Sequence, residues 1–523
     1  MFNNEAKEQP SLLFDHNARW MKICLIVMFL LAALIRRDEI RAPGHLLDRE
    51  YTSAIFARAY YFTNNQEVED WRRDIAVTAM NQQPVLEPTL LEYLVSLQYR
   101  VMGREELFFA RYLTSAFWLI GGVFMFLIAR KLLSVAEAVV STGYFLFVPM
   151  GIIISRSFQP DSLMMMLFLV SLYLLILYFD APSTQRLLLA AVLTGVTLLL
   201  RPLVIFAAFC AFLAFSFHRH QNWKKLVDLP LIIFSVVSLS PSVLYYGYGI
   251  VFAGFMRWKV STSFMPYLLF KNDFWLGWLD NVVGVAELTP LLLAILGFFL
   301  LRDKKTQILV IGLGLSFVIF SVSFTYHIHT HPYYHIQLFP IVALCLAPIV
   351  VHTTTFLMQT TRKAWWLPIV VASLLASYFG YREVRASLYQ GHAEDPVVDW
   401  EIGEAIHHSP NTVFVAHYYG LPLEYYGEFG GAPWPVRIED EFYRRPGEGE
   451  LTVQERIDAL GFVPEYYVIT NFDLYNRKHQ DLGNYLANNC SVLAETNSYL
   501  IYSSCKIVFA ERTSASGSRI VSH

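Results

Sequence analysis

Long apolar runs, separated by polar connectors, fill the first 381 residues of the chain. A helix needs roughly 20 apolar residues to cross the hydrocarbon core of a bilayer. The pattern therefore predicts a mainly α-helical, polytopic membrane protein with about eleven transmembrane helices. The predicted spans are 21–35, 107–129, 135–154, 162–179, 187–200, 203–217, 229–247, 286–301, 307–324, 334–351 and 365–381.

Clusters of Lys and Arg mark every second connector, as alternating orientation requires. Short basic connectors stay on the cytoplasmic side of a membrane. We therefore expect the N-terminus, residues 1–20, to be cytoplasmic and the tail after residue 381 to be extracytoplasmic. The basic connectors carry Arg130 and Lys131, Arg186, Arg219 with Lys224 and Lys225, Arg302 with Lys304 and Lys305, and Arg362 with Lys363. The outer connectors are then 36–106, 155–161, 201–202, 248–284 and 325–333.

The first outer connector, 36–106, departs from this charge rule, which governs long loops only weakly. Its arginines are interleaved with carboxylates and aromatic residues, which favours a site for an anionic ligand over a solvated basic surface. Apolar spacing predicts helices at 51–62 and 88–102 that lie on the membrane surface. We assign this connector to the same module as the spans, residues 21–381.

The tail changes sharply in composition and becomes polar, with Gly and Pro between short periodic segments. We expect residues 382–511 to form a separate soluble α/β domain, because helical and strand patterns alternate. The Ser-rich end, 512–523, is expected to be disordered. The predicted helices are 399–407, 455–460 and 479–488, and the predicted strands are 412–416, 466–470 and a pair within 492–501.

Composition agrees with a membrane protein, since 55% of the 523 residues are hydrophobic and 16% are charged. Lys and Arg number 40 against 43 Asp and Glu, a balance that excludes a nucleic-acid binder with a broad basic face. Of the five cysteines, three lie in apolar runs. Only Cys490 and Cys505, in the polar tail, are suited to form a disulfide.

Ionisable residues at the outer ends of spans are the main candidates for chemistry, because burial near a bilayer is costly for them. Asp161 follows Pro160 at the start of a span, where it would serve either as a helix-capping residue or as a functional acid. Arg201 stands between Leu200 and Pro202 in a very short turn. It would either neutralise a phosphate or extend to lipid headgroups.

The last outer connector and the start of the span that follows it contain four histidines, at positions 327, 329, 331 and 335. Alternate spacing without Cys, Asp or Glu is a weak signal for metal ligands. We therefore expect hydrogen bonding to substrate and interfacial anchoring by the neighbouring tyrosines. The sequence requires no cofactor, and a divalent metal is an alternative without support.

Several short motifs lie in the outer connectors or at the outer ends of the spans. They are the Arg-x-x-x-x-Ala-x-x-Ala-Arg spacing from Arg49 to Arg58, Glu87-Pro88, Arg156-x-x-x-Pro160-Asp161, Arg201-Pro202, and His331-x-Tyr333-Tyr334 before Pro340. In this order they resemble the motifs of GT-C membrane glycosyltransferases, and the nearest branch contains the dolichyl-phosphate-mannose protein mannosyltransferases and the bacterial aminoarabinose transferase of lipid A. The motifs extend over most of the membrane region, and the tail resembles the extracytoplasmic domain often attached to it.

This resemblance implies an inverting transfer of a hexosyl or pentosyl group from a polyprenyl-phosphate carrier to an acceptor hydroxyl on the extracytoplasmic face. It implies a GT-C-like catalytic module, a bacterial inner membrane location, and membrane lipids and a glycan, lipid or protein acceptor as partners. No nucleic acid is expected. The sugar, the carrier length and the acceptor are not specified by the sequence.

The resemblance also assigns roles to residues. An acid early in the first outer loop acts as the base in family members, and Asp48 and Glu50 are the candidates here. The position that is acidic in many relatives is Thr52, so Glu87 is kept as a further candidate. Asp161 matches the second family acid. The residues expected to bind the carrier phosphate or the substrate are Arg49, Arg58, Glu87, Arg156, Arg201, His331, Tyr333 and Tyr334.

Two other classes of protein fit part of the pattern. A transporter or flippase of a lipid-linked or anionic substrate also needs many spans and interfacial charges. Such proteins often consist of two related halves with broken spans, and the sequence has no such symmetry. A non-enzymatic scaffold is disfavoured, because it has no need of buried charges at the outer ends of spans.

Overall fold

The computed structural model describes residues 18–38, 40–41, 49–85, 87–256, 265–361, 395–435, 449, 451–503 and 505. These residues form two compact units. The membrane unit comprises Met1–Ile40 and Ala110–Gln390, and the α/β unit comprises Arg41–Phe109 and Gly391–His523. The first outer connector thus packs with the tail, a grouping that differs from our division of the sequence.

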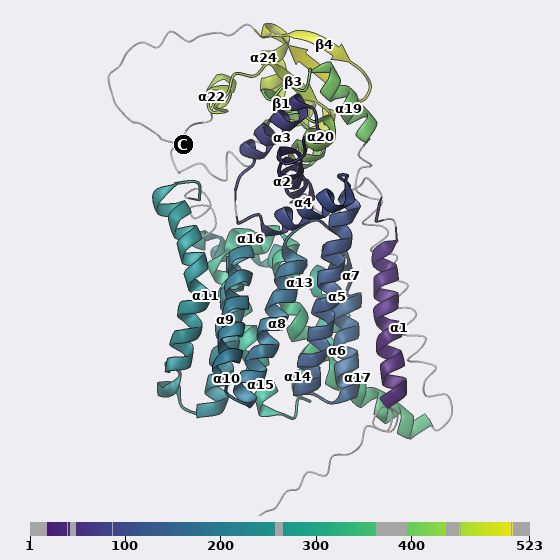
Figure 1. The fold of residues 1–523 in the computed structure, drawn as a ribbon, viewed down its shortest axis with the longest axis vertical. Helices are drawn as coiled ribbons and strands as arrows, with labels where there is room; N and C mark the ends of the chain where they lie inside the picture. The colour runs from purple at the N-terminus through teal and green to yellow at the C-terminus, as the bar shows by residue number, and fades with distance from the viewer. Residues whose placement is uncertain are drawn as a thin grey trace, which may run out of the picture. The chain divides into compact units, whose positions relative to one another are not determined.

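Helices running side by side make up the membrane unit (Figure 1). Its first helix is α1 (Ala18–Arg37), and α5 (Leu107–Leu132) enters the unit after its first turn. The others are α6 (Val135–Phe147), α7 (Pro149–Ser155), α8 (Asp161–Asp180), α9 (Thr184–Leu200), η1 (Pro202–Val204), α10 (Ile205–His220), η2 (Trp223–Lys225), α11 (Leu229–Gly247), η3 (Tyr248–Phe252), η4 (Pro266–Phe270), α13 (Asn272–Ala286), α14 (Leu288–Phe298), α15 (Lys304–Ser323), α16 (Thr325–Thr330), η5 (Pro332–Gln337) and α17 (Leu338–Thr361).

Six helices among the described residues are long and apolar enough to cross a membrane, and two bent pairs raise the number to eight. The predicted class, a mainly α-helical polytopic membrane protein, is confirmed. Of the predicted spans within the described residues, α1 and the 17-residue α9 fall outside these eight. The predicted span 365–381 lies outside the described residues.

The two bent pairs have local causes. Helices α6 and α7 meet at 59°, where Val148 is extended ahead of Pro149, as the residue before a proline prefers. Helices α13 and α14 meet at 88°, across Glu287, whose φ is +65°. The sequence pattern missed α13 by assigning most of it to the connector 248–284, although Trp275, Trp278 and Val282 have helical spacing.

Small residues let helices of the membrane unit approach closely. The Ser171 hydroxyl of α8 bonds the Thr194 hydroxyl of α9 at 2.6 Å. On α14, a Cβ at Gly297 would lie 2.0 Å from the carbonyl oxygen of Cys345 in α17. Only glycine permits that contact. Small and hydroxyl-bearing residues are typical of helix contacts in membranes, where burial of apolar surface gives no advantage over lipid.

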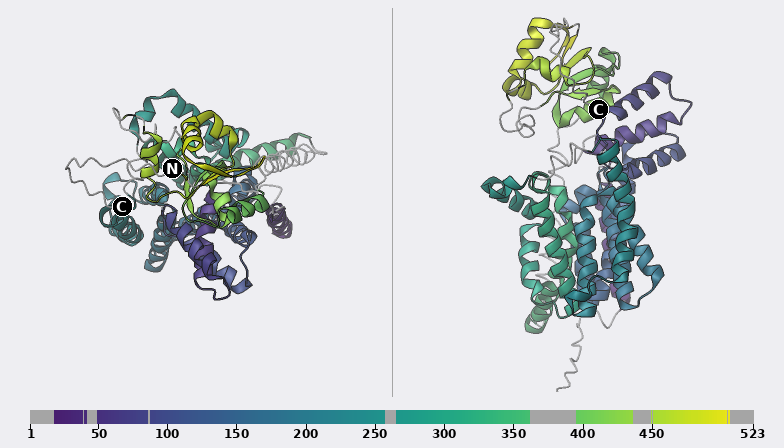
Figure 2. Two further views of the ribbon diagram at one scale, coloured as in Figure 1. Left: turned by 90° about the horizontal axis from the view of Figure 1, so that it is seen from above. Right: turned by 90° about the vertical axis from the view of Figure 1, so that its left-hand side faces the viewer.

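The α/β unit combines helices of the first connector with the tail (Figure 2). The connector provides α2 (Arg49–Thr63), α3 (Asp70–Gln82) and α4 (Leu90–Met102). The tail provides α19 (Pro396–Ala405), β1 (Thr412–Val415), η6 (His417–Gly420), α20 (Leu421–Gly427), β2 (Gly431–Pro433), α22 (Val453–Asp458), β3 (Tyr466–Ile469), α23 (Phe472–Lys478), α24 (Gln480–Asn489), β4 (Ser491–Glu495) and β5 (Leu500–Ser503).

A five-stranded sheet in the order β2-β1-β3-β5-β4 is the centre of the tail domain. Strand β1 pairs in parallel with β2 and β3, whereas β5 is antiparallel to both β3 and β4. Alternate side chains of β1 face opposite cores: Val413 packs with residues of α22, α23 and α24, and Phe414 packs with α19 and α20. The predicted α/β domain is confirmed, and so are its helices and paired strands. Strand β2, only three residues long, was not predicted.

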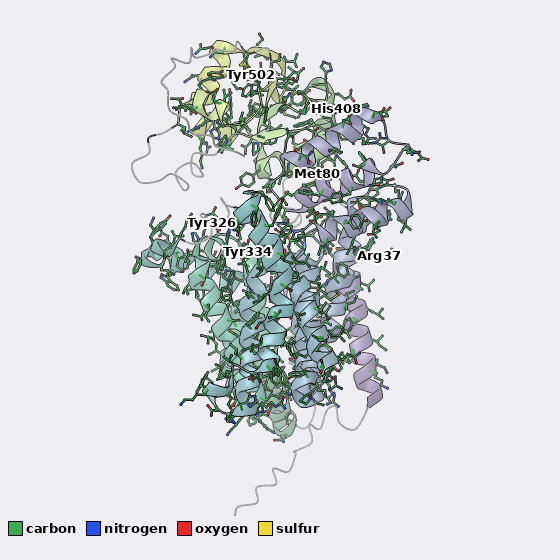
Figure 3. All side chains as sticks on the ribbon, turned by 60° about the vertical axis from the view of Figure 1, so that its left-hand side comes forward. Arg37, Met80, Tyr326, Tyr334, His408 and Tyr502 are labelled. Carbon is green, nitrogen blue, oxygen red and sulfur yellow. A yellow bond between two sulfur atoms is a disulfide. The ribbon has the colours of Figure 1, made fainter. Side chains whose placement is uncertain are left out.

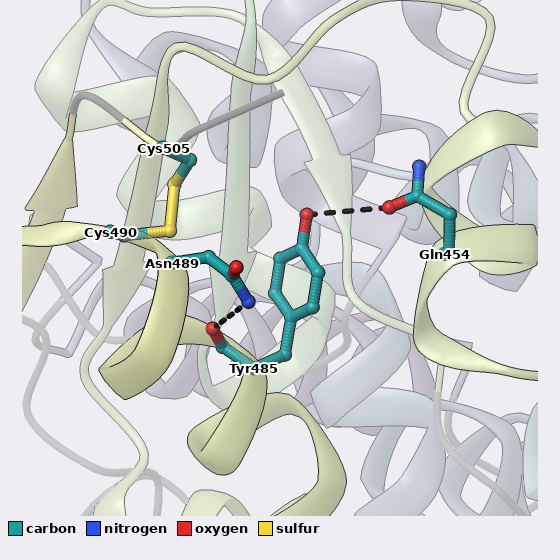
Figure 4. Close-up of a disulfide and its surroundings, with 5 residues drawn as sticks. All are labelled: Gln454, Tyr485, Asn489, Cys490 and Cys505. Carbon is teal, nitrogen blue, oxygen red and sulfur yellow. Dashed lines mark hydrogen bonds between the residues drawn. A yellow bond between two sulfur atoms is a disulfide. The ribbon is translucent and has the colours of Figure 1, made fainter. Parts of the chain in front are cut away.

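Cys490, just before β4, forms a disulfide with Cys505, just after β5 (Figure 4). The predicted pairing is confirmed. Nearby, the Tyr485 hydroxyl donates to the side chain of Gln454 at 3.4 Å, which links α24 to α22. The disulfide therefore ties a residue just after β5 to the residue that precedes β4.

The two helices predicted for the membrane surface differ. Helix α2 is an internal helix of the α/β unit: it packs on α3, α4 and α20, and most of its side chains are buried. The prediction for α2 was wrong because the buried side chains of α2 are distributed around the whole helix, whereas a helix on a membrane surface buries only one face. Helix α4 exposes an apolar stripe at helical spacing, formed by Leu90, Tyr93, Leu94, Leu97 and Val101, as a surface helix requires.

Candidate active site

Polar residues collect at one end of the membrane unit, where several helices begin or end. Arg37, Tyr326 and Tyr334 all lie at this end (Figure 3). The connector between α7 and α8, residues 156–160, packs beside α7, which contacts η5. Side chains from distant parts of the sequence therefore meet here.

Asp161 and Arg201 form a buried ion pair at this end. Asp161 is the first residue of α8, where the helix dipole favours a negative charge. Arg201 has an extended backbone ahead of Pro202, which opens η1. The Arg201 Nη2 donates to Asp161 Oδ2 at 2.7 Å, and both residues are at least nine-tenths buried. Pro160 is the N-cap residue of α8, and the Arg201 guanidinium points to the Asp161 carboxylate instead of extending to headgroups.

Tyr333 lies beside this pair. The guanidinium carbon of Arg201 is 5.8 Å from the centroid of the Tyr333 ring, within the range of a cation–π contact. The Tyr333 ring packs against Tyr334 at 4.6 Å and against His331 at 5.3 Å between centroids. The structure thus brings together residues from three separate parts of the sequence, namely Asp161, Arg201, His331, Tyr333 and Tyr334.

The four histidines do not converge. His327 joins the aromatic cluster, 5.4 Å from the Tyr334 ring. His329 packs against Phe274, and His335 Nε2 donates to the Ile328 carbonyl oxygen at 2.6 Å. Within the described ranges, no group of three or more His, Cys, Asp or Glu residues is arranged to hold a metal ion.

Arg156 connects the same connector to α1. Its guanidinium donates to the carbonyl oxygen of Ile35 at 3.4 Å and to that of Asp38. In return, Arg36 of α1 donates from Nε to the Ser155 hydroxyl at 2.7 Å. Both arginines are buried. These bonds fix the connector to the end of α1.

Arg49, Glu50 and Glu87 lie in the α/β unit, and Asp48 lies outside the described residues. Arg49 Nη2 pairs with Glu87 Oε1 at 2.8 Å. Glu50, in the first turn of α2, is fully buried. Burial raises the pKa of nearby Glu92, against the lowering by Arg49 and by its hydrogen bond from Ser53 at 2.7 Å. The sequence missed Glu92, although a carboxylate on the buried face of an amphipathic helix is a recognisable signal.

Arg58 is occupied by partners within the α/β unit. Its Nε donates to both oxygens of Glu105, at 2.9 and 3.0 Å. Its Nη1 donates to the carbonyl oxygen of Tyr425, and the guanidinium carbon lies 3.8 Å from the Tyr425 ring centroid. The Tyr425 hydroxyl donates to Glu105 at 2.5 Å. Arg58 therefore joins α2 to α20 of the tail, and the structure does not bring it to the residues around Arg49.

The chain resembles known membrane glycosyltransferases in sequence and in fold. Residues 86–246 match the family model of dolichyl-phosphate-mannose-protein mannosyltransferase, a segment that contains Glu87, Arg156, Asp161 and Arg201. A sequence comparison with curated proteins gives no match.

Among solved structures, ArnT from Cupriavidus metallidurans bound to undecaprenyl phosphate has a TM-score of 0.59 and 14% identity over 91% of this chain and 97% of that one. The Archaeoglobus fulgidus oligosaccharyltransferase tethered with an acceptor peptide has a TM-score of 0.57 and 12% identity, over 94% of this chain and 74% of that one. The oligosaccharyltransferase AglB of the same organism, in complex with an inhibitory peptide and a dolichol-phosphate, gives 0.53 and 11%, over 86% and 69%. The predicted resemblance to GT-C membrane glycosyltransferases is confirmed, and the likeness to these structures shows a shared fold.

Proposed function

We propose that this protein is an inverting glycosyltransferase that moves a sugar from a polyprenyl-phosphate carrier to an acceptor hydroxyl on the extracytoplasmic face of the membrane. The observation that carries the proposal is the buried Asp161–Arg201 pair beside Tyr333, at one end of a helical unit with a GT-C fold. The polyprenyl phosphates named with ArnT and AglB support the choice of carrier.

Arg201 is the residue that would meet the carrier phosphate. As the bond between the sugar and the phosphate breaks, its electron pair passes to the phosphate, whose negative charge increases. A guanidinium already held in position stabilises that charge without reorganising at the moment of reaction. Asp161 and the Tyr333 ring hold Arg201 at the end of α9. The tyrosines and His331 around it would contact the carrier head or the sugar.

A carboxylate would accept the proton of the acceptor hydroxyl as its oxygen attacks the anomeric carbon. Attack from the face opposite the phosphate inverts that carbon in a single displacement. Asp48 and Glu50 are the proposed bases, with Glu87 as the alternative and Asp161 as the second acid. The ion pair between Glu87 and Arg49 makes Glu87 a residue that also orients the start of α2.

Two observations support an extracytoplasmic tail and a cytoplasmic N-terminus. Basic connectors alternate along the sequence as this orientation requires. The Cys490–Cys505 disulfide lies in the tail domain, and disulfides persist in oxidising compartments outside the cytosol. Reaction at the outer face follows, because the tail and the first connector share one compact unit.

Transfer of label from a panel of radiolabelled polyprenyl-phosphate sugars to a membrane extract tests the function. The wild-type protein should transfer label from one carrier, and Asp161→Asn should not. Asp48→Asn or Glu50→Gln should abolish turnover while carrier binding persists, because a base acts on the acceptor. Glu67→Gln, at an exposed position of the same connector, is the matched control and should be fully active.

The same assay separates the proposal from a transporter or flippase. If no carrier in an adequate panel is turned over by the wild-type protein, the transferase is excluded and a flux assay with reconstituted vesicles follows. If Asp48→Asn and Glu50→Gln both lose carrier binding as much as turnover, the assignment of the base is overturned while the transferase stands.

A further inference from the structure

Two polar side chains of the connector between α7 and α8 are buried without a hydrogen-bonding partner among the described residues. Ser157 and Gln159 are both 0% exposed. The Ser157 hydroxyl and both polar atoms of the Gln159 amide make no hydrogen bond in this part of the chain. Gln159 stands two residues before Asp161, whose carboxylate holds Arg201.

The backbone of this connector is held firmly. The carbonyl oxygen of Ser155 accepts from the Thr114 hydroxyl at 3.1 Å and from the Ser115 hydroxyl at 2.9 Å. The Ser155 side chain accepts from Arg36, and Arg156 binds the end of α1. These contacts anchor the backbone three residues before Gln159, whose side chain is fully buried. An amide kept buried without partners is costly, and an apolar side chain of the same size would avoid that cost.

Such a group is explained if a ligand satisfies it. A phosphate oxygen only accepts hydrogen bonds, and Arg201 already supplies a matching cation. An amide offers a donor and an acceptor together, as a serine hydroxyl does, and both match a sugar hydroxyl, which also donates and accepts. A site that bonds a hydroxyl discriminates strongly against analogues lacking it, because its own buried groups are then left unpaired.

We propose that Ser157 and Gln159 form a subsite that binds hydroxyl groups of the sugar being transferred. This inference rests on the proposed function and extends it from the carrier phosphate to the sugar. The subsite selects the sugar, whereas Arg201 binds the part of the donor that all carriers share. Gln159 is then a specificity-determining residue.

The experiment compares wild type with Gln159→Leu, which keeps the size of the side chain. Binding of polyprenyl phosphate without sugar should stay within about twofold. The kcat/KM for the intact donor should fall roughly tenfold or more, the loss expected when a buried hydrogen bond to substrate is removed. Ser157→Ala should give a smaller loss of the same kind.

Donors lacking single sugar hydroxyls give the decisive comparison. One deoxy donor should be roughly tenfold or more poorer for the wild-type protein, yet no poorer than the intact donor for Gln159→Leu, because the variant has already lost that bond. Gln307→Leu is the control: its amide bonds the Leu301 carbonyl at 2.7 Å in the connector between α14 and α15, and its kinetics with every donor should match wild type. If Gln159→Leu does not fold, Gln159→Asn and Ser157→Ala are tested with the same donors.

Three results would overturn the subsite. Equal losses for bare carrier and donor would assign Gln159 to the phosphate or to the fold. An unchanged kcat/KM would mean that a buried water satisfies the amide. If the loss of kcat/KM from Gln159→Leu adds to the loss from removing each sugar hydroxyl in turn, Gln159 does not contact any of these hydroxyls. Absence of carrier binding and transfer by wild type would instead overturn the proposed function, and the subsite with it.

Discussion

At the scale of single residues, the membrane unit places its strongest charges where burial is compensated. Asp161 and Arg201 pair with one another at 2.7 Å, and Arg36 and Arg156 donate to hydroxyl and carbonyl oxygens. A buried ion pair contributes little net stability, because desolvation of both charges offsets their attraction. Its presence at the end of α8 is therefore better explained by function than by stability.

This view predicts the outcome of a double-mutant cycle on the pair. Asp161→Leu or Arg201→Met alone should reduce the free energy of unfolding by roughly 3–5 kcal/mol, because each leaves an uncompensated buried charge. The double variant should regain most of that stability. It should remain inactive, and the Arg201 variants should lose carrier binding. Thermal unfolding of the purified protein in detergent and carrier binding measure both quantities.

The cycle also has a clear contrary outcome. If the double variant is as unstable as the sum of the single variants, the two side chains do not compensate one another. If Arg201→Met retains the carrier affinity of wild type, then Arg201 is not the phosphate-binding residue.

Glu424 predicts a pH dependence of stability in the α/β unit. Burial raises the pKa of this carboxyl well above its ordinary 4.5, against the lowering by its hydrogen bond from Gln83 at 2.8 Å. The folded protein therefore holds a proton that the unfolded chain releases above pH 4.5, and stability contributed by this proton is lost as pH rises. Glu424→Gln should match wild type near pH 4 and be more stable at neutral pH, as measured by thermal unfolding.

Glu428 is the control with the opposite sign. Burial opposes its ionised form, but the hydrogen bond from Arg72 and the positive charges of Arg58 and Arg72 together outweigh burial and lower the pKa below 4.5. Stability from Glu428 is present above that ordinary value and is lost as pH falls. Glu428→Gln should thus be less stable than wild type at neutral pH. If Glu424→Gln and Glu428→Gln change the thermal stability in the same way at every pH, the opposite pKa shifts of the two carboxyls are contradicted.

At the scale of elements, a disulfide joins the two ends of the segment that forms the strand pair β4–β5. The Cys490–Cys505 disulfide closes a segment of 15 residues that contains both strands. A loop of that length corresponds to about 3 kcal/mol in the chain-entropy model. Cys490→Ala with Cys505→Ala should lower the stability of the tail domain by about that amount and accelerate its proteolysis.

The unbonded Cys24 provides the control, since it is exposed on α1. Cys24→Ala should leave the proteolysis rate unchanged, and a reducing agent should reproduce the effect of the double cysteine variant in the wild-type protein. No response of the wild type to reduction would contradict a stabilising disulfide.

At the scale of the whole molecule, the proposed orientation predicts which surfaces a membrane-impermeant thiol reagent reaches. In a Cys24→Ala background, Glu404→Cys lies on an exposed helix of the tail domain and Lys304→Cys at the exposed start of α15. In intact cells, the first should be labelled and the second only after permeabilisation. The basic connector at 302–305 is expected in the cytoplasm. The reverse pattern would invert the topology and exclude reaction at the outer face.

Much of the architecture followed from patterns along the chain. Run length and apolarity predicted the mainly α-helical membrane class, and alternation of short helices and strands predicted the tail domain with its paired last strands. These patterns report local periodicity, which the chain carries in consecutive residues. The bend at Glu287 and the three-residue strand β2 were missed, because each depends on partners elsewhere in the structure.

The candidate site divides in the same way. The sequence by itself determined which residues are costly to bury, namely charges such as Asp161 and Arg201 at span ends, because that cost depends on residue type and neighbouring apolarity. Only the tertiary structure decided that these two pair with one another, that Arg58 joins α2 to α20, and that Gln159 is buried without a partner among the described residues. Burial and pairing arise between segments far apart in the chain, so no local pattern encodes them.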